Sequence, residues 1–208
     1  VHVASRSLST HALSIFGDHQ DVYAVRGTGV CMLVSSSVQQ SHYMASIAHL
    51  ASIKGSLPFI NFFDGFRTSH EIDKIRLLDL DKVSKLIDQK SLENFRNNGM
   101  NTNIPTTRGM AENDDIYFQH MEVRNKNYNN CVNYVLKYMD EINKICDTDI
   151  KLFNYYGSAK AKYMIVAMGS VCDTIRETIT DLNDNGCDYG LVEVHLFRPF
   201  SVEHLLKI

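Results

Sequence analysis

The run from Phe59 to Glu71 constrains the fold of this chain more than any other segment. An apolar, aromatic stretch ends at Asp64-Gly65, and a loop of charged and hydroxyl residues follows it. Residues 30–34 form another short apolar run, and residues 38–55 between the two are typical of a helix. A strand, a helix and a strand of these lengths indicate a βαβ unit with a parallel sheet. The predicted fold class is therefore α/β, with ligands gathered where the strands end.

The start of the helix over residues 38–55 carries a capping signal. Ser37 and Gln40 stand at capping-box spacing, in which two polar side chains satisfy free backbone N–H groups. Residues spaced three and four apart are expected to share one face of this helix: Val38, His42, Ala45 and His49.

The remaining pattern predicts a buried strand over residues 1–5, a charged helical region over 72–98 and a surface excursion over 101–113. A helix is expected over 130–146, with one apolar face made of Val132, Val135, Tyr138, Met139, Ile142 and Cys146.

A second unit is predicted beyond the polar stretch 146–149. Its pattern gives a strand over 163–168, a helix over 171–183 that stops at Asn185-Gly186, and a strand over 191–196. Met168-Gly169-Ser170 fits no phosphate-loop pattern and is interpreted as a turn. We expect one domain over residues 1–150 and part of another over 151–208.

Composition narrows the function classes. The 208 residues carry a formal net charge of -3 and no basic cluster, so neither nucleic acid nor an anionic membrane is expected as a partner. No apolar stretch reaches the ~20 residues that cross a bilayer. The five cysteines form no CxxC pair, so we expect reduced thiols and no metal site built from this chain alone. Because the chain starts without methionine, inside an expected strand, we interpret it as a segment of a longer polypeptide.

Arg6, at the end of the first strand, is the leading substrate-binding candidate. A guanidinium is a planar two-pronged donor that fixes a carboxylate in orientation as well as in charge. The alternative is a structural pairing of Arg6 with Asp18 or Asp21.

Gly17-Asp18-His19 is the second candidate cluster. A glycine lets the backbone approach a ligand closely, and a histidine exchanges protons near neutral pH, which makes His19 a candidate catalytic residue. The alternative is that Asp18 caps the segment that follows and that His19 is a polar loop residue.

Asp64, Arg67, Ser69 and His70 form the third candidate cluster. They are expected to line the substrate pocket or to contact another domain of the same protein. The alternative, compatible with the first, is that Thr68 or Ser69 caps a helix that starts at His70.

These motifs resemble the pyruvate:ferredoxin (flavodoxin) oxidoreductase family. The resemblance spans nearly the whole chain in family order, through residues 1–6, 11–21, 35–39, 59–71, 115–119, 168–170 and 196–200. It implies a thiamine-diphosphate pyrimidine-binding-type domain followed by the start of a transketolase C-terminal-like domain. It also implies that Arg6 holds the pyruvate carboxylate. Gly27 stands where the family usually has a glutamine, which loosens the backbone there.

The same resemblance implies the activity of the full enzyme. Pyruvate is oxidatively decarboxylated to CO2 and acetyl-CoA, and electrons pass through [4Fe-4S] clusters to ferredoxin or flavodoxin. Thiamine diphosphate with Mg2+ and coenzyme A are the other implied cofactors, in a homodimer of the cytoplasm or of a reduced organelle in an anaerobic eukaryote. This segment alone is expected to hold none of them, because it lacks the GDG segment and the cysteine clusters.

Two alternatives stay open at this stage. The same core also occurs in a pyruvate:NADP oxidoreductase fusion, whose acceptor modules would lie outside this segment. A non-catalytic interaction subunit could also keep the fold, although Arg6 and the loop from Asp64 to Glu71 argue against it.

Overall fold

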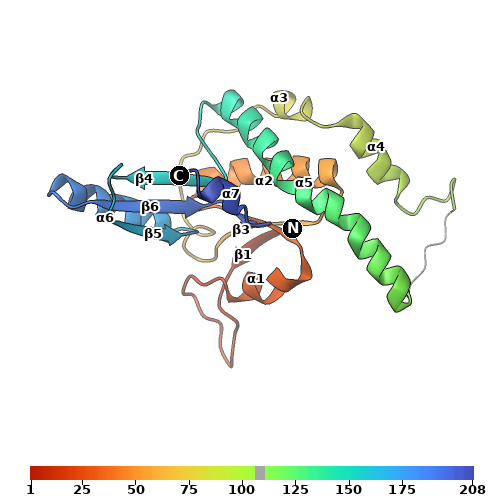
Figure 1. Ribbon diagram of the computed structural model, residues 1–208, viewed down its shortest axis with the longest axis horizontal. Coiled ribbons are helices and arrows are strands. Elements are labelled where there is room, and N and C mark those ends of the chain that lie inside the picture. The colour runs from red at the N-terminus through yellow and green to blue at the C-terminus, as the bar shows by residue number, and fades with distance from the viewer. Residues whose placement is uncertain (106–110) are drawn as a thin grey trace.

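The computed structural model describes residues 1–105 and 111–208 of the chain. It contains two small sheets with helices packed around them (Figure 1). The first sheet has the strand order β1 (His2–Ser5), β3 (Phe59–Asp64), β2 (Cys31–Val34) and β7 (Leu196–Arg198). The second has the order β4 (Phe153–Gly157), β6 (Tyr189–Val194) and β5 (Tyr163–Ala167).

The predicted βαβ unit is confirmed. Strands β2 and β3 pair in parallel from Cys31↔Phe59 to Val34↔Phe62, and α2 (Val38–Gly55) connects them. Strand β1 pairs in parallel with the other edge of β3. The chain is therefore an α/β protein, as its pattern indicated.

Helix α2 begins as predicted but buries a different face. The Ser37 hydroxyl accepts a hydrogen bond from the Gln40 N–H at 3.2 Å, while the Gln40 side chain accepts from Ser36 N instead of Ser37 N. The predicted face is wrong, because α2 is covered both by the sheet and by a second helix. The residues it buries are Tyr43, Met44, Ile47, Ala48, Leu50, Ala51 and Gly55.

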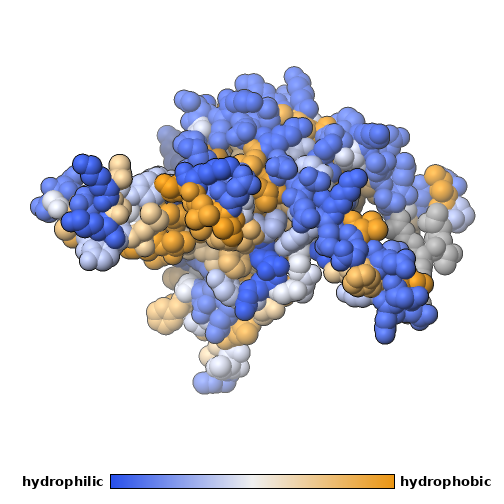
Figure 2. Space-filling view, in the orientation of Figure 1, coloured by the Kyte–Doolittle hydropathy of each residue, from blue (hydrophilic) through white to orange (hydrophobic). Residues whose placement is uncertain are grey.

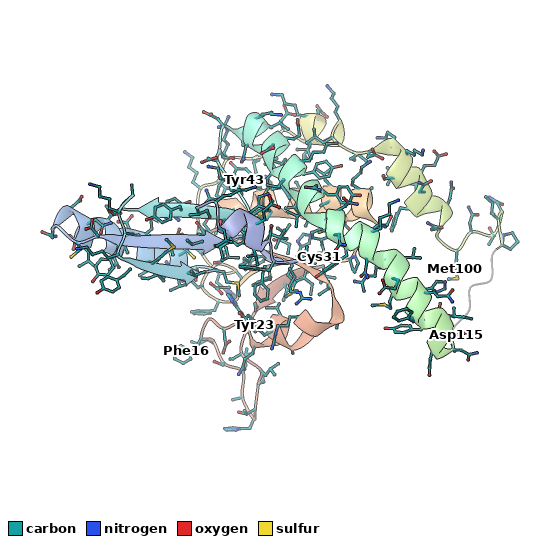
Figure 3. The ribbon with its side chains drawn as sticks, viewed as in Figure 1. Phe16, Tyr23, Cys31, Tyr43, Met100 and Asp115 are labelled. Carbon is teal, nitrogen blue, oxygen red and sulfur yellow. The ribbon has the colours of Figure 1, made fainter. Side chains whose placement is uncertain are left out.

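That second helix is α5 (Asp114–Cys146), which begins well before the expected residue 130. Its predicted apolar face is confirmed over the second half, where Val135, Tyr138 and Ile142 are fully buried. The first half extends away from the two sheets (Figure 1). On β2, Cys31 faces α5, and its sulfur lies 3.5 Å from the sulfur of Cys131 (Figure 3).

The charged region after the Asp64 loop is only partly helical. Helices α3 (Leu80–Ser84) and α4 (Gln89–Asn97) start where Asp79 and Asp88 cap free backbone N–H groups. Residues 71–79 are not helical, so the helix expected to start at His70 is absent. Of the surface excursion expected over 101–113, residues 106–110 lie outside the described part of the chain.

Strand β1 is an edge strand and is less buried than predicted. His2 and Ala4 are exposed, and within the strand only Ser5 is buried. Among the described residues, β1 has β3 on one side and no strand on the other. Helix α1 (Gln20–Val25) and the short 3-10 helix Arg26–Thr28 follow the loop that leaves this strand. They lie on the side of the sheet opposite to α2 and α5 (Figure 1).

The second unit matches its prediction in most elements. Strand β5 and α6 (Val171–Asp184) lie where expected, and Gly186 adopts a left-handed φ of 89° just after the helix. Strand β4 was not predicted. Hydrophobic side chains gather over the strands of this sheet (Figure 2), and those of Tyr163, Met164 and Val166 on its edge strand β5 are exposed.

The strand expected over 191–196 splits into β6 and β7, and β7 leaves the second sheet to join the first. Leu196 pairs with Leu33 of β2 in antiparallel register. One core cluster therefore runs through both units, from Leu33 and Val135 to Phe153 and Val194. The chain ends just after the short helix α7 (Val202–Leu205), and no helix of the described residues is long and apolar enough to span a membrane.

Candidate functional site

The carboxyl ends of β1 and β3 meet at one edge of the first sheet. The two strands are parallel neighbours, and Ser5 is the register partner of Asp64. Arg6 follows Ser5 directly, so Arg6 and Asp64 leave the sheet at the same edge. This confirms the relationship on which the predicted site depends.

Asp21 holds the loop that links β1 to α1. Its carboxylate accepts hydrogen bonds from the Ser5 hydroxyl at 2.5 Å, from the Arg6 backbone N–H at 3.0 Å and from the Val22 N–H at 2.7 Å. Asp18 stands directly before His19, the N-cap residue of α1, and its Oδ1 accepts from the N–H groups of His19 at 2.6 Å and Gln20 at 3.1 Å. The loop is thus tied to the end of β1 by charge-assisted hydrogen bonds.

The guanidinium of Arg6 takes no part in the hydrogen bonds by which Asp21 holds this loop. Asp21 bonds the backbone of Arg6, and no ion pair joins the Arg6 side chain to an acidic side chain within residues 1–105 and 111–208. The backbone of Arg6 forms an antiparallel bridge with Gly17, and its side chain lies against Gly65. The expected alternative, a structural pairing with Asp18 or Asp21, is therefore absent.

His19 and Asp64 form a close pair. Asp64 Oδ1 lies 2.5 Å from His19 Nε2, and the imidazole meets the Phe62 ring edge-on with centroids 5.2 Å apart. Asp64 is only 6% exposed. Burial favours its neutral form, but the hydrogen bonds from His19 and Ser170 outweigh burial and lower the pKa of Asp64 below its ordinary value. Asp64 is therefore a carboxylate at neutral pH.

Residues of the second unit contact the His19–Asp64 pair. The backbone N–H of Ser170 donates to Asp64 Oδ2 at 2.5 Å. Gly169 precedes it with a left-handed φ of 82°, and a β-carbon there would stand 2.8 Å from Asp64 Oδ2 and 3.0 Å from His19 Cε1. Residues 168–170 were interpreted only as a turn. The turn is present, and the glycine directly before a helix was the available signal for a close approach.

A cleft of about 540 Å³ opens around the pair. It contains Asp18, His19, Asp64 and Arg67 together with residues of the second unit. Its full lining is Gly17, Asp18, His19, Asp64, Arg67, Met168, Ser170, Val171 and Thr174. Arg6 borders this cleft through Gly17 and Gly65 but does not line it.

His70 lies apart from the cleft, and Arg67 is at its rim. The His70 ring packs against Phe66 with centroids 5.5 Å apart and bonds the Ser69 hydroxyl. Arg67 is largely exposed and pairs with Glu71 at 3.5 Å. Ser69 accepts a hydrogen bond from the Phe66 N–H inside the turn and caps no helix.

A larger hollow of about 610 Å³ lies along β4, between α5 and the end of the chain. One of the residues that line it, His195, lies in the protein interior and is only 1% exposed. Burial lowers the pKa of the His195 imidazole. We place the candidate site at the smaller cleft, because His19 Nε2 lies 2.5 Å from the Asp64 carboxylate there, whereas His195 Nε2 lies 3.8 Å from Glu193 Oε2 in the interior.

The cleft offers groups that suit an organic anion or a ring. It offers a histidine, an arginine and the apolar side chains of Met168 and Val171. Among the described residues, no group of three or more His, Cys, Asp and Glu side chains is arranged to hold a metal ion.

The fold of residues 1–140 is that of a domain of the pyruvate flavodoxin/ferredoxin oxidoreductases. Residues 1–140 match the family model for pyruvate flavodoxin/ferredoxin oxidoreductase, thiamine diphosphate-binding, and residues 161–208 match core domain II of pyruvate:ferredoxin oxidoreductase. The chain belongs to the pyruvate:ferredoxin/flavodoxin oxidoreductase family, which confirms the resemblance of its motifs.

Individual relatives agree with this assignment. The chain is 52% identical over 206 residues to the pyruvate-flavodoxin oxidoreductase of Enterobacter agglomerans, covering 99% of this chain and 18% of that protein. It is 47% identical over 207 residues to the pyruvate:ferredoxin oxidoreductase of Moorella thermoacetica, covering 100% and 18%. It is 45% identical over 208 residues to the mitochondrial pyruvate dehydrogenase [NADP(+)] of Euglena gracilis, covering 100% and 12%. The chain thus spans only a small part of the length of these relatives.

A solved structure supports the fold. The 2-oxoglutarate:ferredoxin oxidoreductase from Magnetococcus marinus, with 2-oxoglutarate, coenzyme A and succinyl-CoA bound, aligns with a TM-score of 0.59. The alignment covers 98% of this chain and 38% of that one at 14% identity, so it bears on the fold alone.

Proposed function

We propose that this chain is a segment of an enzyme that oxidatively decarboxylates pyruvate to acetyl-CoA and CO2 and passes the electrons to ferredoxin or flavodoxin. The observation that carries the proposal is the guanidinium of Arg6, which has no acidic partner among the described residues and lies at the same sheet edge as the His19–Asp64 pair. Membership of the family supplies the reaction, and the edge supplies groups suited to a small 2-oxoacid.

Arg6 is the proposed carboxylate clamp. Its two-pronged donor would orient the pyruvate carboxylate, which is the group that leaves as CO2, and orientation of this kind lowers the entropic part of the barrier. Asp21 supports this role because it accepts a hydrogen bond from the backbone N–H of Arg6 and forms no ion pair with the Arg6 side chain.

The other candidates take supporting roles in this proposal. His19 is the proposed catalytic residue, since its ring lines the cleft. Gly17 and Asp18 shape the backbone beside it, and Arg67 forms the rim of the substrate pocket. His70, which packs against Phe66 and does not line the cleft, is proposed to contact another domain of the same enzyme.

Thiamine diphosphate is the proposed cofactor of the full-length enzyme, where it supplies the electron sink that decarboxylation of a 2-oxoacid requires. The residues of this cleft suit the ring and substrate end of that cofactor. The Mg2+-diphosphate end, the [4Fe-4S] clusters and the coenzyme A site are proposed to lie in other parts of the protein. We also propose a homodimer in the cytoplasm or a reduced organelle, and a domain division near residue 150.

A second candidate is a fusion that delivers the electrons to NADP. The Euglena gracilis relative, which is named for NADP, matches this chain over its whole length. The proposed substrate site is the same in both candidates, which differ in the acceptor modules.

The experiment is an assay of the full-length protein with pyruvate, coenzyme A, thiamine diphosphate and Mg2+. Reduction of ferredoxin, flavodoxin and NADP+ is measured separately, with 2-oxoglutarate in place of pyruvate as the control. We expect pyruvate-dependent reduction of ferredoxin or flavodoxin. Reduction with 2-oxoglutarate alone would contradict the proposed substrate, and reduction of NADP+ alone would select the fusion.

A further inference from the structure

We propose that Asp64 is a positioning residue that fixes the tautomer of His19, so that Nδ1 of the imidazole is the atom offered to a ligand in the cleft. The inference rests on the function proposed above and concerns how its histidine is arranged. The described structure supports it through three features: the partners of the two Asp64 oxygens, the surroundings of His19 Nδ1, and the fit of Gly169.

Both oxygens of Asp64 are engaged by donors. Oδ1 lies 2.5 Å from His19 Nε2, and Oδ2 accepts the backbone N–H of Ser170 at 2.5 Å. An ionised carboxylate only accepts hydrogen bonds, so Nε2 must carry the proton of the neutral imidazole. Nδ1 is then the unprotonated nitrogen.

Nδ1 of His19 is free to meet a ligand. It has no hydrogen-bond partner within the described residues, and it does not belong to the buried polar atoms that lack one. The His19 side chain is 16% exposed and lines the cleft. A proton taken from a bound ligand at Nδ1 would produce an imidazolium whose Nε2–H stays on the Asp64 carboxylate, and the same proton could be returned.

The other charged groups of the cleft do not compete for the ring. Asp18 uses Oδ1 to accept two backbone N–H groups, and Arg67 pairs with Glu71. Asp64 is therefore the carboxylate that decides the state of His19.

The second unit makes the arrangement rigid. Gly169 packs so closely that a β-carbon would stand 2.8 Å from Asp64 Oδ2 and 3.1 Å from His19 Nε2. The Ser170 N–H fixes which way the carboxylate is turned, much as a second partner fixes a metal-ligating histidine. The position of the second unit is thereby coupled to the state of His19.

Asp64→Asn in the full-length protein is the direct test. The Ser170 N–H remains a donor, so the amide oxygen must face it and the amide NH2 must face His19 Nε2. That contact reverses the tautomer and places the proton on Nδ1. We expect kcat with pyruvate to fall about 10²-fold or more, the range of general acid–base catalysis, while KM for pyruvate and the thermal midpoint stay near those of the parent.

A second readout does not need turnover. The C2 proton of an imidazole exchanges with deuterium through the protonated ring, and mass spectrometry of the His19 peptide measures its rate. Loss of the neighbouring carboxylate in Asp64→Asn should slow this exchange about threefold or more. A parent-like exchange rate together with a parent-like kcat would overturn the proposal.

Gly169→Ala and Gly186→Ala form a matched pair. Both glycines have a left-handed φ, 82° and 89°, but a β-carbon at Gly186 meets nothing within 4 Å. We expect Gly169→Ala to lower kcat and slow the His19 exchange, and Gly186→Ala to change neither. Equal effects would show that only backbone strain matters and would overturn the coupling. This pair decides the matter if Asp64→Asn does not fold.

The outcomes separate the two proposals. If the parent does not act on pyruvate, the proposed function fails, and the exchange rates still test the His19–Asp64 pair. If the parent acts on pyruvate and both readouts are unchanged in Asp64→Asn, the positioning role fails alone.

Discussion

The side chain of Arg6 lies directly against the backbone of Gly65. A β-carbon on Gly65 would stand 2.5 Å from Arg6 Cγ, 2.7 Å from Arg6 Nε and 2.7 Å from the Ser5 carbonyl oxygen. The glycine after Asp64 therefore provides the space in which the proposed carboxylate clamp lies.

Gly65→Ala should disturb Arg6 without touching its charge. The added methyl cannot fit beside the Ser5 carbonyl, so the Arg6 side chain must move, and we expect kcat/KM for pyruvate to fall about tenfold or more. Gly27→Ala is the control, because a β-carbon there meets nothing within 4 Å. Steady-state kinetics of the two full-length variants make the comparison, and equal activities would contradict the packing argument.

Arg6→Lys and Arg6→Ala test the clamp itself. Lysine keeps the charge but loses the two-pronged geometry, and alanine loses both. Loss of such a charge-assisted contact costs about 2–5 kcal/mol, which corresponds to a fall in kcat/KM of roughly thirty- to several-thousand-fold. Lysine should recover only part of the loss. Variants that unfold, or that turn over pyruvate at the parent's rate, would make Arg6 a structural residue.

The purified 208-residue chain should not bind thiamine diphosphate tightly and should not decarboxylate pyruvate. The reason is that the chain lacks the GDG segment that, by resemblance to thiamine enzymes, holds the Mg2+ and the diphosphate. Isothermal titration calorimetry with thiamine diphosphate and Mg2+ is the measurement. Micromolar binding by the chain alone would show that the diphosphate site lies within it.

The cysteines should differ sharply in reactivity. Four of the five are buried and Cys187 is partly exposed, and burial raises the pKa of the Cys172 thiol to about 12. Because the thiolate is the reactive form, a thiol reagent at pH 8 should label one site in the folded chain and five after denaturation. Peptide mapping identifies the site, and rapid labelling of Cys31 or Cys131 would contradict the described core.

Acid should destabilise the protein through His195. Burial lowers the pKa of this imidazole, so between its folded pKa and the unfolded value near 6.5 the proton binds the unfolded chain better. The contribution of His195 to the free energy of unfolding should be constant above about pH 6.5 and should fall below it, by at most about 1.4 kcal/mol per pH unit.

Thermal unfolding of the full-length protein between pH 5 and 8 measures this slope. His195→Asn should flatten it, while His11→Asn, at an exposed position, should leave it unchanged. A stability that rises as the pH falls from 6.5 would contradict the sign of the argument.

Much of the fold, and the placement of Arg6 and Asp64 in the site, follow from local sequence patterns. Where strands end is a property of the sequence, and the parallel register of β1 and β3 then brings Arg6 and Asp64 to one edge. The apolar face of α5 repeats every three or four residues, so its buried half was also predictable. The buried face of α2 was not, because it depends on which elements lie on both sides of the helix.

The sequence by itself determined the α/β class, the family and the sheet edge that carries Arg6 and Asp64. Only the tertiary structure decided that Asp64 takes His19, 45 residues away, and Ser170, 106 residues away, as its partners. It also decided that β7 returns to the first sheet and that His70 lies apart from the cleft. Strand and helix patterns arise from neighbours in the chain, whereas the partner of a buried carboxylate depends on where distant loops come to lie against it.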